Sequence, residues 1–126
     1  MTTEAAPITD RPVVAIINRA TASAAEMLAG ALKDNHRGAL VGTKTFGQDL
    51  IHSLQPLTDG SGLVIAVARF KTPAGTDVGR GGISPDYAVE SAETNLVRNR
   101  PATDPQYQQA ARVLLLEISR LQKARD

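Results

Sequence analysis

The sequence predicts an α/β fold, and three observations lead to that prediction. A strand–helix–strand pattern occupies residues 13–42, where short apolar runs flank a segment with helical spacing. Two further apolar runs enclose a strong turn signal within residues 50–71, as in an antiparallel hairpin. An amphipathic segment from 105 to 121 predicts a last helix.

The first unit begins with Val13–Ile17, a run rich in β-branched residues that is typical of a fully buried strand. Residues 24–35 follow as a helix, closed by Asn35 and Gly38. Ala39–Gly42 is a short second strand. A strand, a helix and a strand in this order predict a right-handed parallel unit.

The second unit is the hairpin. Leu50–Leu54 and Leu63–Lys71 are its strands, and Pro56–Gly62, which contains an Asp-Gly dipeptide, is its turn. The part from Leu63 to Ala68 is nearly continuous in apolar residues, so we expect that strand to be central in the sheet.

The segment after the hairpin contains many glycines and prolines. Thr72–Gly82 is expected to be a long mobile loop. Ile83–Asp86 cannot be helical, because Ser84 precedes a proline, and it should form an edge segment leading to Tyr87–Val89. Residues 90–101 are expected to be a connection.

The last helix is predicted to begin with Thr103 or Asp104 as its cap and Pro105 as its first residue. One apolar stripe, with spacings of four and three, contains Tyr107, Ala111, Leu114, Ile118 and Leu121. That stripe needs a surface to cover, either the sheet or a partner chain. We therefore expect a homo-oligomer built through this helix or through an exposed sheet edge.

Composition excludes several classes of function. The chain has 126 residues, a net charge of +1, few aromatic residues and no tryptophan, so it offers no surface for nucleic acid or for an anionic membrane. It has no cysteine, which excludes thiolate catalysis and cysteine zinc sites. No metal-ligand spacing links its two histidines, His36 and His52, so we expect neither a metal nor a cofactor.

The chain shows no membrane or export signal. No apolar stretch reaches transmembrane length, and Met1–Asp10 is a polar lead-in without the apolar centre of a signal peptide. If the protein works outside the cytoplasm, we expect its export signal to lie outside these residues.

Ser23 stands where the first strand passes into the helix, and two interpretations fit it. The spacing from Ser23 to Glu26 is that of a capping box, in which both side chains bond backbone amides of the first turn. The same place suits a nucleophile, because the free N–H groups of a first helical turn can face an anion. On local sequence alone the cap is favoured.

Several short blocks together resemble the C-terminal processing peptidases, or tail-specific proteases, which are serine proteases with a Ser–Lys dyad. The family's nucleophile motif is similar to G-T-A-S-A-S-E, and residues 20–26 stand in its place. The resemblance continues in order through Met27–Asn35, Thr45–Gly47, Leu57–Leu63 and the segment Gly82–Asp86. It covers residues 11–90 and shifts the balance at Ser23 toward the nucleophile.

The resemblance implies roles for five residues. Ser23 matches the nucleophile and the Ala24 amide one oxyanion donor. Asp34 matches an acidic position of the family, and a solvated residue near the helix end is as good an interpretation of it as a structural or catalytic role. Gln48 stands where the family has its lysine base, and a glutamine has no basic site. His52 stands where many members have a supporting glutamine. A histidine can act as a base, but here a half-buried strand residue is the simpler interpretation.

The resemblance also implies a fold, a partner and a place. The fold would be the C-terminal part of a Clp protease/crotonase-like core, over residues 11–92, between the lead-in 1–10 and the helical end 93–126. The substrate class would be polypeptide C-termini, and the compartment the periplasm, cell envelope or thylakoid lumen. The family's PDZ domain and upstream half-domain, which carries the second oxyanion donor, have no counterpart in this sequence.

Three functions remain open at this point. The chain is a fragment or an inactive relative of a C-terminal processing endopeptidase, or a non-catalytic assembly or polypeptide-binding module derived from that fold, or a small α/β domain in which Ser23 only caps a helix. Gln48 favours the second, and the retained Ser23 and Asp34 favour the first.

Overall fold

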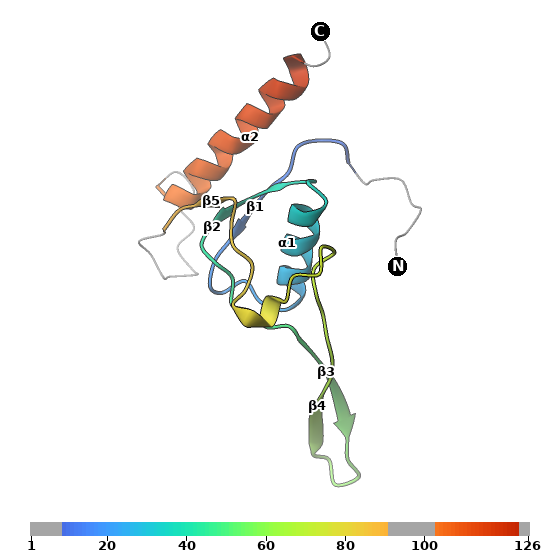
Figure 1. Ribbon diagram of the computed structural model, residues 1–126. Helices are drawn as coiled ribbons and strands as arrows, with labels where there is room; N and C mark the ends of the chain where they lie inside the picture. The colour runs from blue at the N-terminus through green and yellow to red at the C-terminus, as the bar shows by residue number, and fades with distance from the viewer. Residues whose placement is uncertain (1–8, 91–102, 124–126) are drawn as a thin grey trace.

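The computed structural model describes residues 9–90 and 103–123, and Figure 1 separates them into a body, a hairpin and a projecting helix. The hairpin extends from the lower end of the body in this view, and the C-terminal helix runs away from the opposite end. In chain order the elements are β1 (Val14–Ile17), α1 (Ala24–Asp34), β2 (Ala39–Gly42), β3 (Leu50–Pro56), β4 (Gly62–Arg69), the 3₁₀ helix η1 (Val78–Arg80), β5 (Tyr87–Ala88) and α2 (Pro105–Lys123).

The body is built on a three-stranded parallel sheet in the order β1-β2-β5. Val14 lies opposite Ala39, and Val41 lies opposite Tyr87. The parallel pairing of the first two strands confirms the predicted strand–helix–strand unit. The short β5 at the edge confirms the placement of the segment after residue 83.

The central strand β2 is covered on both faces, which is why it is a short apolar run without alternation. The full burial expected for Val13–Ile17 is wrong, because β1 lies at an edge of the sheet, where Ile17 is buried but Ile16 is 41% exposed. Leu40, fully buried, faces α1 in a cluster completed by Ile17, Ala29, Val78 and Ile83. Its neighbour Val41, also fully buried, faces α2 in a second cluster with Ala110 and Val113. The mixed α/β class is therefore confirmed.

Helix α1 lies close against the segment that follows the hairpin. Ala29 and Gly30 are its buried small residues, and a Cβ on Gly30 would lie 2.7 Å from a methyl group of Thr72. Leu28, by contrast, is 63% exposed. The inner face of α1 therefore consists of small residues, since they allow this close approach.

The C-terminal end of α1 differs in one detail from the prediction. Asn35 is the C-cap, but the left-handed residue is His36, with φ 51, rather than a glycine at position 38. The amide of Arg37 returns to the carbonyl of Leu32 at 2.9 Å, so a Schellman-type ending forms around the histidine.

Helix α2 begins as predicted and packs with a different face. The carboxylate of Asp104, the residue before Pro105, accepts a hydrogen bond at 2.8 Å from the amide of Gln106, the residue after it. Ala110 and Val113 pack on the sheet, whereas most of the predicted stripe is exposed: Tyr107, Ile118 and Leu121. Of the two surfaces predicted for the stripe, the sheet is covered instead by Ala110 and Val113, and the coverage of the stripe by a partner chain stays a prediction.

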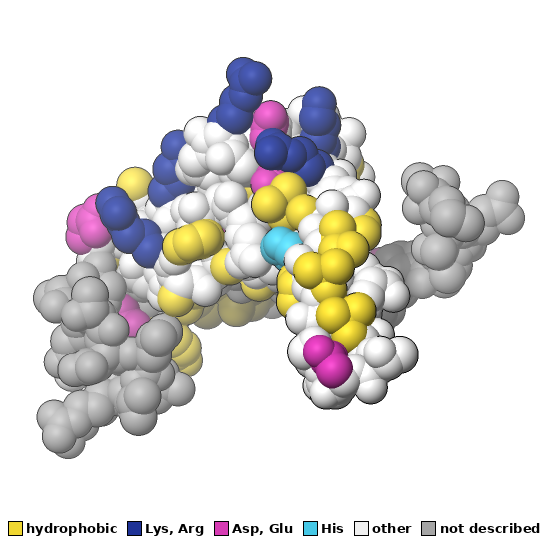
Figure 2. Space-filling model, turned by 90° about the horizontal axis from the view of Figure 1, so that it is seen from below, with side chains coloured by type: hydrophobic (Ala, Val, Ile, Leu, Met, Phe, Trp, Pro, Cys, Tyr) yellow, Lys and Arg dark blue, Asp and Glu magenta, His cyan; other side chains and the backbone are white. Residues whose placement is uncertain are grey.

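The hairpin pairs from Leu50 opposite Arg69 to Pro56 opposite Gly62, so its turn is tighter than predicted. Its antiparallel pairing is confirmed, but the central position expected for the second strand is wrong. β3 and β4 form a separate two-stranded sheet, and every residue of β4 is exposed. Figure 2 shows the resulting column of apolar side chains on the part that stands off the body.

The segment expected to be a long loop contains η1. Val78 is fully buried in the cluster beneath α1, and Lys71 bridges to Asp77 ahead of it. The predictions for residues 1–8 and for the connection at 91–102 fall outside the described part of the chain. No helix within the described ranges combines the length and apolar character that a bilayer crossing requires.

Candidate functional site

Ser23 is the N-cap of α1, as the sequence predicts, and its backbone is strained. Its φ is 53 and its ψ is −120, close to the first central position of a type II′ turn, which glycine usually occupies. The amide of Ala25 closes this turn on the carbonyl of Ala22 at 3.1 Å. A serine held in such a conformation is a feature that clusters at functional sites.

The Ala24 amide follows Ser23 at the start of the first turn. No acceptor for it is found among residues 9–90 and 103–123. It is one of the N–H groups that a helix leaves without an intrahelical partner, at the end where the helix dipole favours negative charge. An oxyanion next to Ser23 could therefore accept a hydrogen bond from this amide.

Glu26 links the Ser23 turn to a distant loop. Its side chain is fully buried, and each carboxylate oxygen accepts two hydrogen bonds. Oε1 accepts the Thr45 hydroxyl at 2.5 Å and the Gly47 amide at 2.7 Å. Oε2 accepts the Ser23 amide at 3.0 Å and the Gln48 amide at 2.8 Å. The Glu26 half of the predicted capping box is thus only one part of a wider network.

The loop between β2 and β3 is held by further contacts. The amide of Phe46 donates to the carbonyl of Thr21 at 3.0 Å, next to the Ser23 turn. The Thr45 hydroxyl accepts the Ile83 amide at 2.7 Å while it donates to the buried carboxylate. Gly47 has φ 94, a left-handed conformation that favours glycine. The backbone at the lysine position of the family is therefore fixed by its neighbours.

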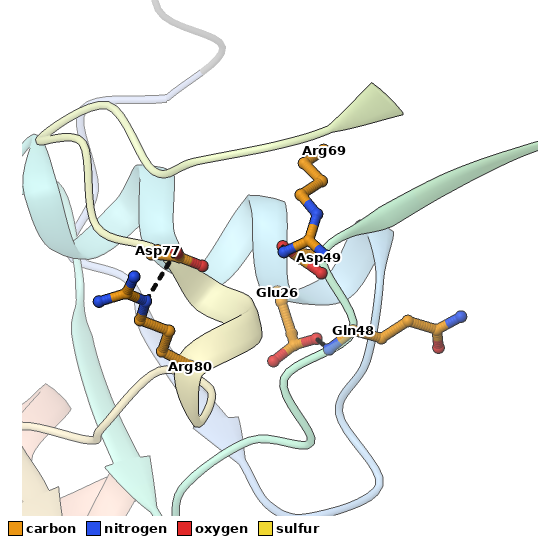
Figure 3. Close-up of polar contacts among 6 residues, drawn as sticks. All are labelled: Glu26, Gln48, Asp49, Arg69, Asp77 and Arg80. Atoms are coloured by element: carbon orange, nitrogen blue, oxygen red, sulfur yellow. Dashed lines mark hydrogen bonds and ion pairs between the residues drawn. The ribbon is translucent and has the colours of Figure 1, made fainter. Parts of the chain in front are cut away.

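Gln48 carries its own side chain away from this network. Its backbone amide points at Glu26, and its side chain extends in the opposite direction in Figure 3. The residue is half-buried. A primary amide can donate and accept hydrogen bonds, but it cannot take the proton of a serine at neutral pH.

Asp34 and His52 are not brought to Ser23. Asp34 lies at the far end of α1, which with 11 residues spans ~16 Å. The Thr72 hydroxyl and then the Ala74 amide hold the pKa of the Asp34 carboxyl below its usual range. The Ala74 amide donates to this carboxylate at 2.8 Å. His52 is exposed on β3, opposite Ala66 in the hairpin.

Two ion pairs lie beside the network in Figure 3. Asp49 is buried and contacts Arg69 at 3.4 Å, across the root of the hairpin. Asp77 contacts Arg80 at 3.4 Å within the η1 segment. Across the part of the chain that the structure describes, no three His, Asp or Glu side chains gather as metal ligands would.

Sequence reasoning identified Glu26 only as a partner of Ser23 and missed its reach to Thr45, Gly47 and Gln48. Those residues are 19 to 22 positions further along the chain, beyond any local pattern. The available signal was the co-occurrence of the 20–26 and 45–48 blocks in one family resemblance.

Residues 1–89 match the family described as Peptidase family S41. The chain belongs to this family. It is 48% identical over 108 residues to a carboxyl-terminal-processing protease of Picosynechococcus sp., covering 86% of this chain and 26% of that protein. It is 52% identical over 79 residues to the chloroplastic C-terminal processing peptidase of Tetradesmus obliquus, covering 63% of the chain and 17% of that relative.

Two solved structures share the fold. The photosystem II D1 C-terminal processing protease superposes with a TM-score of 0.55 at 52% identity, over 62% of this chain and 20% of that one. Mature CPAF, at 24% identity and a TM-score of 0.53 over 61% of this chain and 15% of its own, shares the fold. The chain spans about a quarter of the length of the Picosynechococcus protease and of a similar carboxyl-terminal-processing protease of Synechocystis sp..

Proposed function

We propose that Ser23 is the nucleophile of a C-terminal processing endopeptidase, in which it forms an acyl-enzyme with a polypeptide substrate near its C-terminus. The strained turn at the start of α1 carries this proposal, because it holds Ser23 next to the Ala24 amide, which has no acceptor within the described residues. That amide serves as one oxyanion donor. The chain forms the C-terminal part, residues 11–92, of a Clp protease/crotonase-like catalytic core.

The chain as it stands lacks a base, and we propose that it is inactive for this reason. Gln48 occupies the lysine position and cannot accept the Ser23 proton. General-base assistance typically contributes about 10²–10⁴-fold to a rate. A second oxyanion donor, which the family resemblance assigns to a segment upstream of these residues, contributes about 10²–10³-fold. The whole protein is expected in the periplasm, cell envelope or thylakoid lumen.

Active-site labelling with a fluorophosphonate tests these roles. The chain is compared with Ser23→Ala, Gln48→Lys, His52→Ala and the double variant Gln48→Lys/Ser23→Ala. We expect labelling only after Gln48→Lys, and we expect the double variant to abolish it. That result would place the nucleophile at Ser23 and the missing function at position 48.

Two other outcomes would overturn parts of the proposal. Labelling of the unmodified chain that is lost in both Ser23→Ala and His52→Ala would replace it with a Ser–His pair. Labelling of Gln48→Lys that persists without Ser23 would remove the nucleophile assignment.

A non-catalytic assembly or polypeptide-binding module is the second candidate, and the exposed apolar surface of the hairpin and of α2 favours it. Leu54, Val64 and Leu116 are each more than half exposed. Such a module would self-associate or capture extended chains whatever residue stands at position 48. Light scattering over a wide concentration range measures the association, and a stable monomer would argue against an assembly role.

A further inference from the structure

We propose that Glu26 is a positioning residue that holds the nucleophile turn and residue 48 in one fixed arrangement. The proposal rests on the proposed function of Ser23 and deepens it. Its key observation is that one atom, Oε2 of Glu26, accepts both the Ser23 amide at 3.0 Å and the Gln48 amide at 2.8 Å. The two residues that a serine–lysine pair would use are therefore tied to the same oxygen.

The environment of Glu26 makes this tie rigid. The side chain is fully buried, where an ionised carboxylate is costly unless donors satisfy it. Here four donors do so, and they come from two segments that α1 and β2 separate in the sequence. Loss of the carboxylate would leave partly buried N–H groups on both segments without this acceptor.

The chemistry of the network requires a carboxylate. Three of the four partners are backbone amides, which only donate, and the Thr45 hydroxyl already accepts the Ile83 amide. A glutamine at position 26 would offer one oxygen and would turn its NH₂ group toward donors. The change Glu26→Gln keeps the volume of the side chain and breaks about half of the network, which makes it the most informative variant.

Two measurements test the proposal. The first is the rate of fluorophosphonate labelling of Ser23 in the Gln48→Lys background, with and without Glu26→Gln. Misplacing reacting groups by about 1 Å can cost about 10²-fold, so we expect a loss of that order. The second is the amide chemical shifts of Ser23, Gly47 and Gln48 in the unmodified chain, which should all move together in Glu26→Gln.

Asp86→Asn is the matched control. The Asp86 carboxylate also accepts a backbone amide, that of Leu40 at 2.8 Å, and it pairs with Lys33 at 3.1 Å in the last turn of α1, at the opposite end of the helix from Ser23. The same acid-to-amide change there should leave the labelling rate and the three amide shifts unchanged. Thr45→Ser, which keeps the hydroxyl donor, should retain the labelling rate, whereas Thr45→Val should lower it.

The outcomes separate the two proposals. If Gln48→Lys is labelled and Glu26→Gln labels equally fast, the positioning role is wrong while the Ser23 assignment stands. If Gln48→Lys is not labelled at all, the assigned function of the site fails. The amide shifts then decide the positioning role alone, since independent shifts of residues 23 and 48 would overturn it and a joint shift would support it.

Discussion

The body and the hairpin use the same kind of sequence in opposite ways. In the body, β2 is a short apolar strand with Leu40 and Val41 fully buried between two helices. In the hairpin, β4 is a longer apolar strand with every residue exposed. An apolar run therefore indicates that a strand is suited to burial, but it does not indicate which surface, if any, covers that strand.

The candidate site lies where these two regions meet. The loop between β2 and β3 leaves the body beside the Ser23 turn, and Glu26 binds its backbone there. One residue later, the carbonyl of Asp49 accepts the Phe70 amide at 3.0 Å and closes the root of the hairpin. The body thus positions the site, and the hairpin begins directly after the loop backbone that Glu26 binds.

The largest expected effect is the difference in lost unfolding free energy between a leucine truncated in the body and one truncated in the hairpin. Leu40→Ala removes a fully buried side chain from the body, and such changes cost about 2–5 kcal/mol in unfolding free energy. Leu54→Ala truncates a leucine of the hairpin that is 66% exposed, and it should change stability by less than about 0.5 kcal/mol. Urea denaturation monitored by circular dichroism measures both.

An equal loss in the two variants would break the comparison. It would mean that the hairpin is covered in solution, because an exposed leucine has little packing to lose. Repeating the Leu54→Ala measurement at several protein concentrations identifies self-association as the cause, since stability would then rise with concentration.

The sequence predicted the body better than the hairpin and the helix faces for physical reasons. The β-branched run Val13–Ile17 and the capping spacing from Ser23 to Glu26 are local signals, and both are confirmed as strand and helix start. The central placement of Leu63–Ala68 and the docking of the α2 stripe depended on partners far away in the chain or outside it. Periodicity does not contain that information.

At the site, the position of Ser23 followed from local pattern, whereas its strained φ of 53 did not. The bonds from Glu26 to the loop at Gly47 and Gln48 also needed the tertiary structure. The hypothesis that position 48 lacks a base came from the family resemblance alone, because the backbone bond of Gln48 to Glu26 is one that any non-proline residue could make there. The local sequence pattern thus placed Ser23 at the start of the helix, whereas the contacts that hold it there became visible only in the tertiary structure.

A smaller effect is expected from the strain at Ser23. Ser23→Ala keeps a side chain at φ 53, whereas Ser23→Gly can adopt that conformation freely. A strained position of this kind costs about 1–3 kcal/mol in stability, which glycine avoids. Glycine also lowers stability by about 0.5–1 kcal/mol, because its unfolded chain has more conformational entropy. We expect Ser23→Gly to be more stable than Ser23→Ala by about 1 kcal/mol in urea denaturation.

The reverse order would show that the turn relaxes in the alanine variant. A glycine scan gives the internal control: Ala25→Gly lies in the first turn of α1 without a positive φ. It should lower stability by up to about 1 kcal/mol, which is the ordinary cost of glycine in a helix. Only the position with the left-handed backbone should gain from glycine.

The smallest effect contrasts two carboxylates as pH falls. In the body, the Thr72 hydroxyl and the Ala74 amide lower the pKa of Asp34. In the hairpin, the Ser61 hydroxyl and then the Ser61 amide lower the pKa of Asp59. A lowered folded pKa adds stability above the unfolded value of about 3.9, and this stability is lost as pH falls through the folded pKa.

Asp34→Asn should therefore lower the unfolding free energy at pH 7 by less than about 1 kcal/mol, and the difference from the parent should vanish once the pH has fallen below the folded pKa of Asp34. Asp59→Asn should leave global unfolding unchanged at every pH, because its bonds to Ser61 lie within one exposed turn. Its effect should appear only in the amide shift of Ser61. A pH-dependent loss of global stability in Asp59→Asn would instead show that the hairpin unfolds together with the body. If the turn opened independently, the protonation of Asp59 could not change the stability of the body.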